Sequence, residues 1–152
     1  MSLPDTNSVV REYLVNDAGI IAFFAPAAPR IYCPRLPENC ALPSIGFFTR
    51  GGTSTPYIPD IPTPSYQFDC WAKDIEAAGV VTTRGSIKAR ELYRKLYDAL
   101  QGIQNVSVEV PSGSGTYYVI LSAREEVQGQ DLVDVDVQGY FRVLTFFEIM
   151  VR

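Results

Sequence analysis

The sequence contains no histidine among its 152 residues. Histidine is the commonest general base near neutral pH, and it completes the usual serine and cysteine catalytic triads. No GxGxxG or Walker-type phosphate loop is present either, and the short GxG at Gly113 and Gly115 lies between predicted strands, where glycine is typical of a hairpin turn. These absences exclude the commonest catalytic designs. We expect a protein that is not an enzyme and holds no cofactor.

Cysteine is scarce, with Cys33, Cys40 and Cys70 as the three examples. An odd number argues against the disulfide framework of a small secreted protein. Cys33 and Cys40 flank a proline-rich segment, so either a bridge joins them or all three thiols are free. A structural zinc site needs four ligands, and neither a CxxC pair nor a histidine is present to complete one. We therefore expect no metal site.

Charge of either sign is modest, with 13 Lys and Arg against 17 Asp and Glu, a net charge of −4. Duplex DNA binding usually needs a basic face to neutralise phosphates, and this balance argues against one. No apolar run approaches the length of about 20 residues that crosses a bilayer. The N-terminus lacks the basic start and apolar centre of a signal peptide. We expect a cytosolic protein, or part of a particle assembled there, with no membrane partner.

The pattern of apolar residues predicts one α+β domain over residues 1–152, because 47% apolar content gives this length a core of its own. Asp5 or Thr6 can cap a first helix, and a short second helix follows Asp17 and ends before Pro26. The apolar residues expected on the core side of this pair are Val9, Val10, Tyr13, Leu14, Ile20, Ile21, Phe23 and Phe24.

The longest predicted helix covers residues 83–100, where apolar residues recur at steps of three and four opposite a charged side. We expect this helix and the N-terminal pair to pack on an antiparallel or mixed sheet. The predicted strands are residues 30–33, 44–50, 65–71, 106–110, 116–123, 133–137 and 140–151.

Two apolar surfaces exceed the needs of one core. Residues 51–64, with two glycines and four prolines, predict a loop or extended arm, and exposed apolar residues on such an arm need a partner. The last strand has a second apolar face, which is either covered by helices or a subunit interface. The residues that we expect at subunit contacts are Tyr57, Ile58 and Ile61 on the arm and Leu144, Phe146 and Met150 on the strand.

Asp131, Asp134 and Asp136 form the most suggestive acidic group. They could bind calcium or act as paired carboxylates, but calcium sites usually take six to eight oxygens from a tight loop. Their spacing fits the solvated face of a strand better. In a ring around passing DNA, such acids would line a channel that repels phosphate.

Trp71, near Phe68 and Tyr66, could stack a base or a ligand, and the alternative is a core or subunit contact. One side of the long helix is basic and could touch phosphate, although a charged helix face is usually only solvated. The basic residues are Arg84, Lys88, Arg90, Arg94 and Lys95.

The order of short motifs resembles the tail completion, or tail terminator, family of long-tailed bacteriophages. Arg30-Ile31-Tyr32-Cys33-Pro34 is similar to the family's R-I-Y-P strand, with Cys33 interrupting the Y-P step. Leu36-Pro37 and Leu42-Pro43-Ser44-Ile45 resemble its L-P turn and following strand. Tyr66-Gln67-Phe68-Asp69-Cys70-Trp71-Ala72 resembles its F-Q-I-D-x-W-A strand, and the helix from Ala89 to Leu100 follows it as in the family.

The resemblance implies a virion protein, assembled in the host cytoplasm, that forms a hexameric ring at the head-proximal end of the tail tube. Such a ring stops tube growth, docks the filled head through a connector or stopper protein, and lets DNA pass without binding it specifically. The nearest alternative is another neck protein of the same particle, a connector or stopper. Two others are a small acid–base enzyme using Asp134 and Asp136, and a small-ligand or nucleic-acid binder using Trp71.

Overall fold

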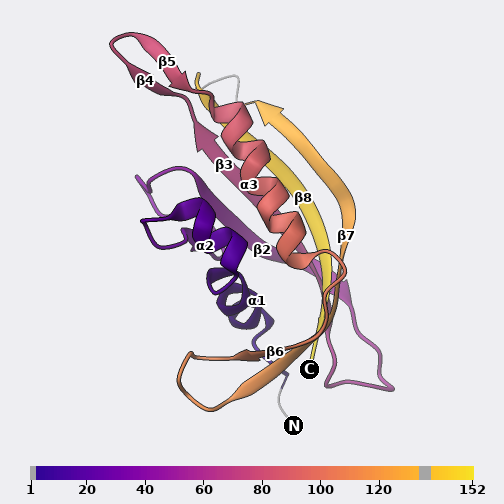
Figure 1. Ribbon diagram of the computed structural model, residues 1–152. Coiled ribbons are helices and arrows are strands. Elements are labelled where there is room, and N and C mark those ends of the chain that lie inside the picture. The colour runs from indigo at the N-terminus through magenta and orange to yellow at the C-terminus, as the bar shows by residue number, and fades with distance from the viewer. Residues whose placement is uncertain (1–2, 134–137) are drawn as a thin grey trace.

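The chain folds as an α+β domain with one mixed, curled sheet, and its computed structural model describes residues 3–133 and 138–152 (Figure 1). The described helices are α1 (Thr6–Val15), α2 (Ala18–Phe24) and α3 (Gly85–Leu100). The described strands are β1 (Ile31–Tyr32), β2 (Ser44–Thr53), β3 (Thr63–Lys73), β4 (Ile75–Ala77), β5 (Val80–Thr83), β6 (Gln104–Glu109), β7 (Tyr117–Val133) and β8 (Tyr140–Val151).

The main sheet has the strand order β1-β2-β3-β8-β7-β6, so β3 and β8 are central. Adjacent strands of this sheet pair antiparallel, except β1 and β2, which run parallel. The predicted sheet is therefore confirmed, including its mixed character. β4 and β5 form a separate two-stranded hairpin that projects beyond the start of α3 (Figure 1).

Acidic side chains cap the N-termini of the described helices. Asp5 and Asp17 cap α1 and α2, accepting hydrogen bonds from the backbone N–H groups of Ser8 and Ile20. The first residue of α3 is capped from outside the helix, because Gly85 N donates to Asp74 Oδ1 at 2.8 Å. The predicted caps of the N-terminal pair are confirmed, and the cap of α3 comes from a segment that the helical pattern does not include.

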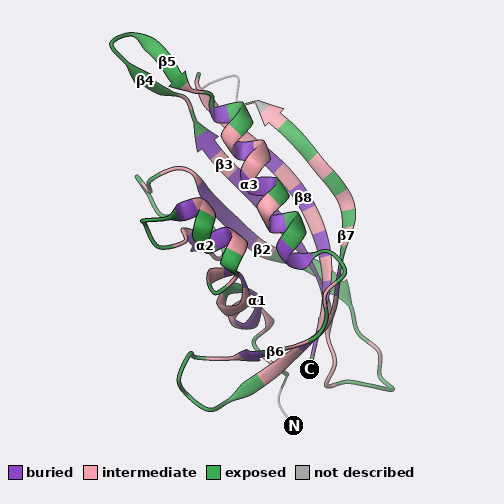
Figure 2. Cartoon of the chain, in the orientation of Figure 1, coloured by how far each residue is buried: buried purple, intermediate pink, exposed green. Residues whose placement is uncertain are grey.

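The helices cover one face of the sheet, and the core lies between the two layers (Figures 1 and 2). α3 packs on β3 and β8 through a stripe that includes Leu92 and Leu96, both fully buried. α1 contacts both edge strands, β1 and β6, and Arg11 Nε donates to Ile31 O at 3.1 Å. The curl of the sheet thus brings its two edges to the same helix.

Several boundaries differ from the sequence-based expectation. β7 continues ten residues past Ala123 to Val133, held by pairing with β8 rather than by an apolar pattern of its own. The β4–β5 hairpin was not predicted, because its apolar residues are exposed and have no polar alternation. Ile21 is 43% exposed instead of buried, since Ile20 and Phe24 fill the core side of the short α2. Part of the predicted strand 133–137 lies outside the described residues.

A substitution at Gly85 tests how closely the start of α3 packs against its neighbours. A Cβ at this position would lie 2.6 Å from the carbonyl carbon of Lys73 and 2.8 Å from Phe141 Cδ2. We expect Gly85→Ala to lower the free energy of unfolding by about 1–3 kcal/mol, as overpacking does in well-packed sites. Urea denaturation measures the change, and Ser86→Ala, at an exposed neighbour, is the control. Equal midpoints for the two variants would contradict the close packing described.

Candidate functional site

The face of the sheet opposite the helices carries a half-buried apolar surface, here called the outer face. Along β8, burial alternates: residues such as Val143 and Phe147 are buried under the helices, whereas their neighbours are only half-buried (Figure 2). Paired residues of adjacent strands point to the same face of the sheet. Side chains of β2 and β3 therefore lie beside the half-buried side chains of β8. The apolar residues that define the outer face are Phe48, Trp71, Leu144, Phe146 and Met150.

Arginine side chains lie over the aromatic rings of this face. The Arg50 guanidinium lies 3.7 Å from the centroid of the Phe146 ring, and that of Arg142 lies 5.0 Å from Trp71. Such stacking is favourable and leaves the planar cation accessible to a second partner. The outer face therefore combines apolar and cationic groups, a composition typical of the centre of protein interfaces.

Asp69 lies beneath this arginine layer and is 8% exposed. Gln67 Nε2 donates to its Oδ2 at 3.3 Å, and Arg142 Nη1 lies 3.8 Å from its Oδ1, which has no hydrogen-bond partner among the described residues. Burial raises the pKa of the Asp69 carboxyl, and Gln67 and Arg142 offset this in part. A buried carboxylate with an unpaired oxygen is costly, so Asp69 opposes folding in its charged form.

The proline-rich segment is shorter as a loop than predicted. Residues 51–53 continue β2 and residues 63–64 begin β3, with a register shift between Thr49 and Gly52. Between them, Tyr57 is 92% and Ile58 is 52% exposed. Ile61 is half-buried and its N–H donates to Ile58 O at 3.3 Å, so two of the three arm residues expected at a contact are fully presented.

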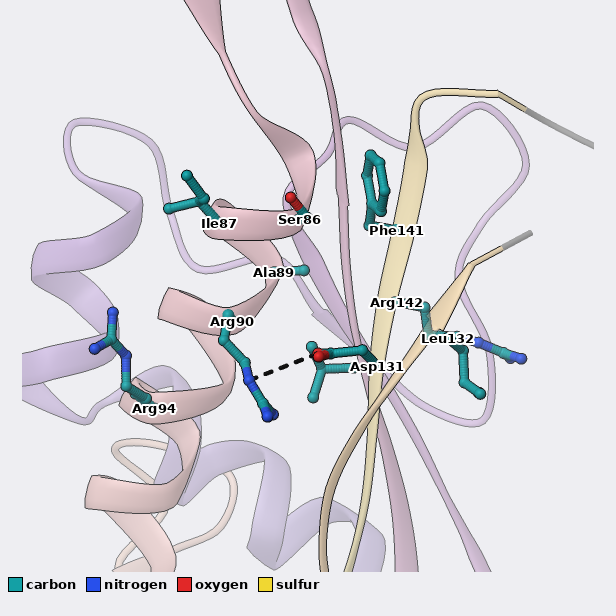
Figure 3. A pocket seen from close by; sticks show the side chains of 10 residues that line it. Ser86, Ile87, Ala89, Arg90, Arg94, Asp131, Leu132, Phe141 and Arg142 are labelled. Atoms are coloured by element: carbon teal, nitrogen blue, oxygen red, sulfur yellow. Dashed lines mark ion pairs between the residues drawn. The ribbon is translucent and has the colours of Figure 1, made fainter. Parts of the chain in front are cut away.

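A cavity of about 630 Å³ opens between the first half of α3 and strands β7 and β8 (Figure 3). Apolar side chains form most of its wall, and Arg90 Nε pairs with Asp131 Oδ1 at 3.6 Å beside it. The lining residues are Ser86, Ile87, Ala89, Arg90, Arg94, Asp131, Leu132, Phe141, Arg142 and Val143.

Of the three acids expected to line a channel, Asp131 is described and lies on the helix-covered side of the sheet, with its side chain 67% exposed. Asp134 and Asp136 lie outside the described residues. Among residues 3–133 and 138–152, no three histidine, cysteine, aspartate or glutamate side chains gather to hold a metal ion. All three cysteines are free, so the bridge between Cys33 and Cys40 is not formed.

The aromatic group suggested as a stacking platform is divided between the two faces. Tyr66 and Phe68 are fully buried under the helices, whereas Trp71 is half-buried on the outer face. The alternation of β3 separates them, because successive residues point to opposite sides. The basic side of α3 is also partly neutralised: Lys88 pairs with Glu91 at 3.3 Å and Arg90 with Asp131.

A polar cluster behind α3 was missed by sequence reasoning. Tyr93 OH donates to Glu125 Oε2 at 2.7 Å and accepts from Gly129 N at 3.1 Å, while Thr145 Oγ1 lies 2.8 Å from Glu125 Oε2. Burial and Glu125 raise the pKa of Tyr93 to about 12. β6 pairs with β7 up to Ser122, and these bonds satisfy backbone groups beyond that point. The cluster therefore holds the edge of β7 beyond the end of β6.

No protein-family model matches the chain, and no curated protein matches it. Among the described residues, no helix combines the length and apolar content that spanning a bilayer requires. The motifs that carry the phage-tail resemblance lie in β1, in the loop before β2, in β3 and in α3. They therefore contribute an edge strand, a central strand and the helix that covers the sheet.

The buried carboxyl of Asp69 predicts a definite pH dependence. Because the folded pKa is raised above the unfolded value of about 3.9, the folded state binds the proton more tightly and loses stability as pH rises through both values. We expect the stability of Asp69→Asn relative to wild type to increase from pH 3 to pH 7. Urea titrations across this range measure the difference, with the exposed Asp98→Asn as the control for loss of one charge. A difference that falls with pH would refute this account of Asp69.

Proposed function

We propose that this protein is a structural subunit of a bacteriophage virion that caps the head-proximal end of the tail tube as a ring. In this role it stops tube growth and forms the surface that docks the head. The proposal is supported by the motif order described above.

The observation that carries the proposal is the outer face of the sheet. Trp71, Leu144 and Phe146 lie on the central strands, yet the helices all lie on the other side (Figure 2). Contiguous apolar surface on a folded monomer marks an interaction site more often than chance. An enzyme would need reactive groups in a cleft, whereas this surface is broad and carries apolar and stacked cationic groups.

A ring requires a heterologous contact that repeats around an axis. The outer face and the loop bearing Tyr57 and Ile58 supply two different surfaces on one subunit, as such a contact needs. Tail tube protein and a connector or stopper protein would occupy the two ends of the ring. A net charge of −4 fits a channel through which DNA passes without being held by its phosphates.

The loop provides the direct test, since its residues are exposed and their replacement should not disturb the fold. We expect Tyr57→Ser combined with Ile58→Ser to weaken ring formation by roughly tenfold or more, as loss of aromatic and apolar anchors does at interfaces. Light scattering of the chain, alone and with purified tail tubes, measures assembly, and electron microscopy locates the density. Tyr117→Ser, at a 62% exposed tyrosine on β7, is the matched control.

A wild-type chain that stays monomeric and ignores tubes at high concentration would overturn the proposal. Binding to the head connector without binding to tubes would instead favour the connector or stopper role. If the loop double variant assembles as well as the Tyr117→Ser control, the loop does not take part in the subunit contact, even if rings form.

A further inference from the structure

The β4–β5 hairpin exposes apolar side chains both at its base and next to its turn. Ile75, Val80 and Val81 are 49%, 65% and 43% exposed. The turn is tight, because Ala78 and Gly79 both have positive φ, 53° and 78°, as a two-residue hairpin turn requires. An isolated two-stranded ribbon is marginal in water, so a docking surface would stabilise it.

The base of this hairpin is fixed to the body. Asp74 Oδ1 accepts the hydrogen bond from Gly85 N at the start of α3, and Asp74 N donates to Gly139 O at 2.7 Å, before β8. The hairpin therefore leaves the domain in a set direction, on the side of the sheet away from β7 (Figure 1). A projection with a fixed base presents its tip at low entropic cost.

The cavity between α3 and strands β7 and β8 has both apolar and cationic side chains in its wall. Ile87, 60% exposed, and Phe141 provide apolar wall, and Arg94 lies on α3 beside it (Figure 3). Arg90 pairs with Asp131 at 3.6 Å, whereas Arg94, also on α3, has no ion-pair partner among the described residues. Arg142 points away toward the outer face, where it contacts Trp71 and Asp69.

The hairpin supplies the opposite charge. Glu76 is the one ionisable residue between Ile75 and Thr83, and it pairs with Val81 in the ladder, so carboxylate and apolar side chain share a face. The Glu76 carboxylate on the hairpin of one copy is therefore opposite in charge to Arg94 at the cavity of another copy. A contact of this kind is heterologous and repeats from subunit to subunit.

We propose that the β4–β5 hairpin of one copy docks in the cavity between α3 and strands β7 and β8 of a neighbouring copy, with Val81 in the cavity and Glu76, on the same face of the hairpin, beside Arg94. This contact rests on the proposed ring and adds a second pair of surfaces between successive subunits. It is distinct from the outer face and from the loop with Tyr57, and it is tested without tail tubes.

Site-directed crosslinking tests the contact. Val80→Cys, in a background with Cys33→Ser and Cys40→Ser, is labelled with a benzophenone maleimide, mixed with isotopically labelled chains and irradiated at high concentration. We expect crosslinks between copies to map to residues 86–94 and 141–143 by mass spectrometry. Tyr117→Cys, labelled in the same way, is the control and should not reach these residues.

A charge exchange sharpens the test. Glu76→Arg on the labelled chain should lower the crosslink yield by up to roughly fivefold, and Arg94→Glu on the acceptor should restore it, as for a solvent-accessible ion pair. Crosslinks confined to the same chain, crosslinks to other regions, or a yield no higher than the control would overturn the proposal. If rings form but their crosslinks map to other residues, the hairpin contact is wrong and the tail-end function is unaffected. If the expected crosslinks form but the chain does not bind tubes, the hairpin contact is correct and the tail-end function is wrong.

Discussion

Packing of α3 on the central strands β3 and β8 is the interaction on which the rest of the structure depends. Its stripe contains Leu92, Leu96 and Leu100, all fully buried, and each such side chain contributes about 1.5–3 kcal/mol when removed from water. Because Asp74 both caps α3 and binds the turn before β8, the helix is fixed along the sheet as well as onto it. With α1 and α2 on the same side, the opposite face of the same strands is left for contacts outside the domain (Figure 1).

Both edges of the sheet contact other parts of the domain. α1 lies against both edge strands, and the Tyr93–Glu125 bond with its neighbours holds β7 beyond the end of β6. The apolar surface that remains lies on the outer face, on the loop around Tyr57 and on the β4–β5 hairpin, three places suited to side-chain contacts between rigid subunits.

Sequence patterns predicted the elements whose own residues decide their structure. The long helix, the caps Asp5 and Asp17 and the alternation of β8 follow from local spacing. The length of β7 did not, because its polar second half is a strand only through pairing with β8. The hairpin and the cavity beside α3 also escaped prediction, since one has exposed apolar residues and the other is formed by segments distant in sequence, such as Ile87 and Phe141.

The chain offers two natural probes of the outer face: Trp71, its one tryptophan, and Met150, one of its two methionines. Both side chains are readily oxidised, so hydroxyl-radical footprinting reports their access to solvent. The measurement compares the isolated chain with the chain assembled on tail tubes. If the outer face is the assembly surface, oxidation of both residues falls on assembly, while that of the exposed Tyr117 stays the same. Full assembly with unchanged oxidation of Trp71 and Met150 would contradict the account.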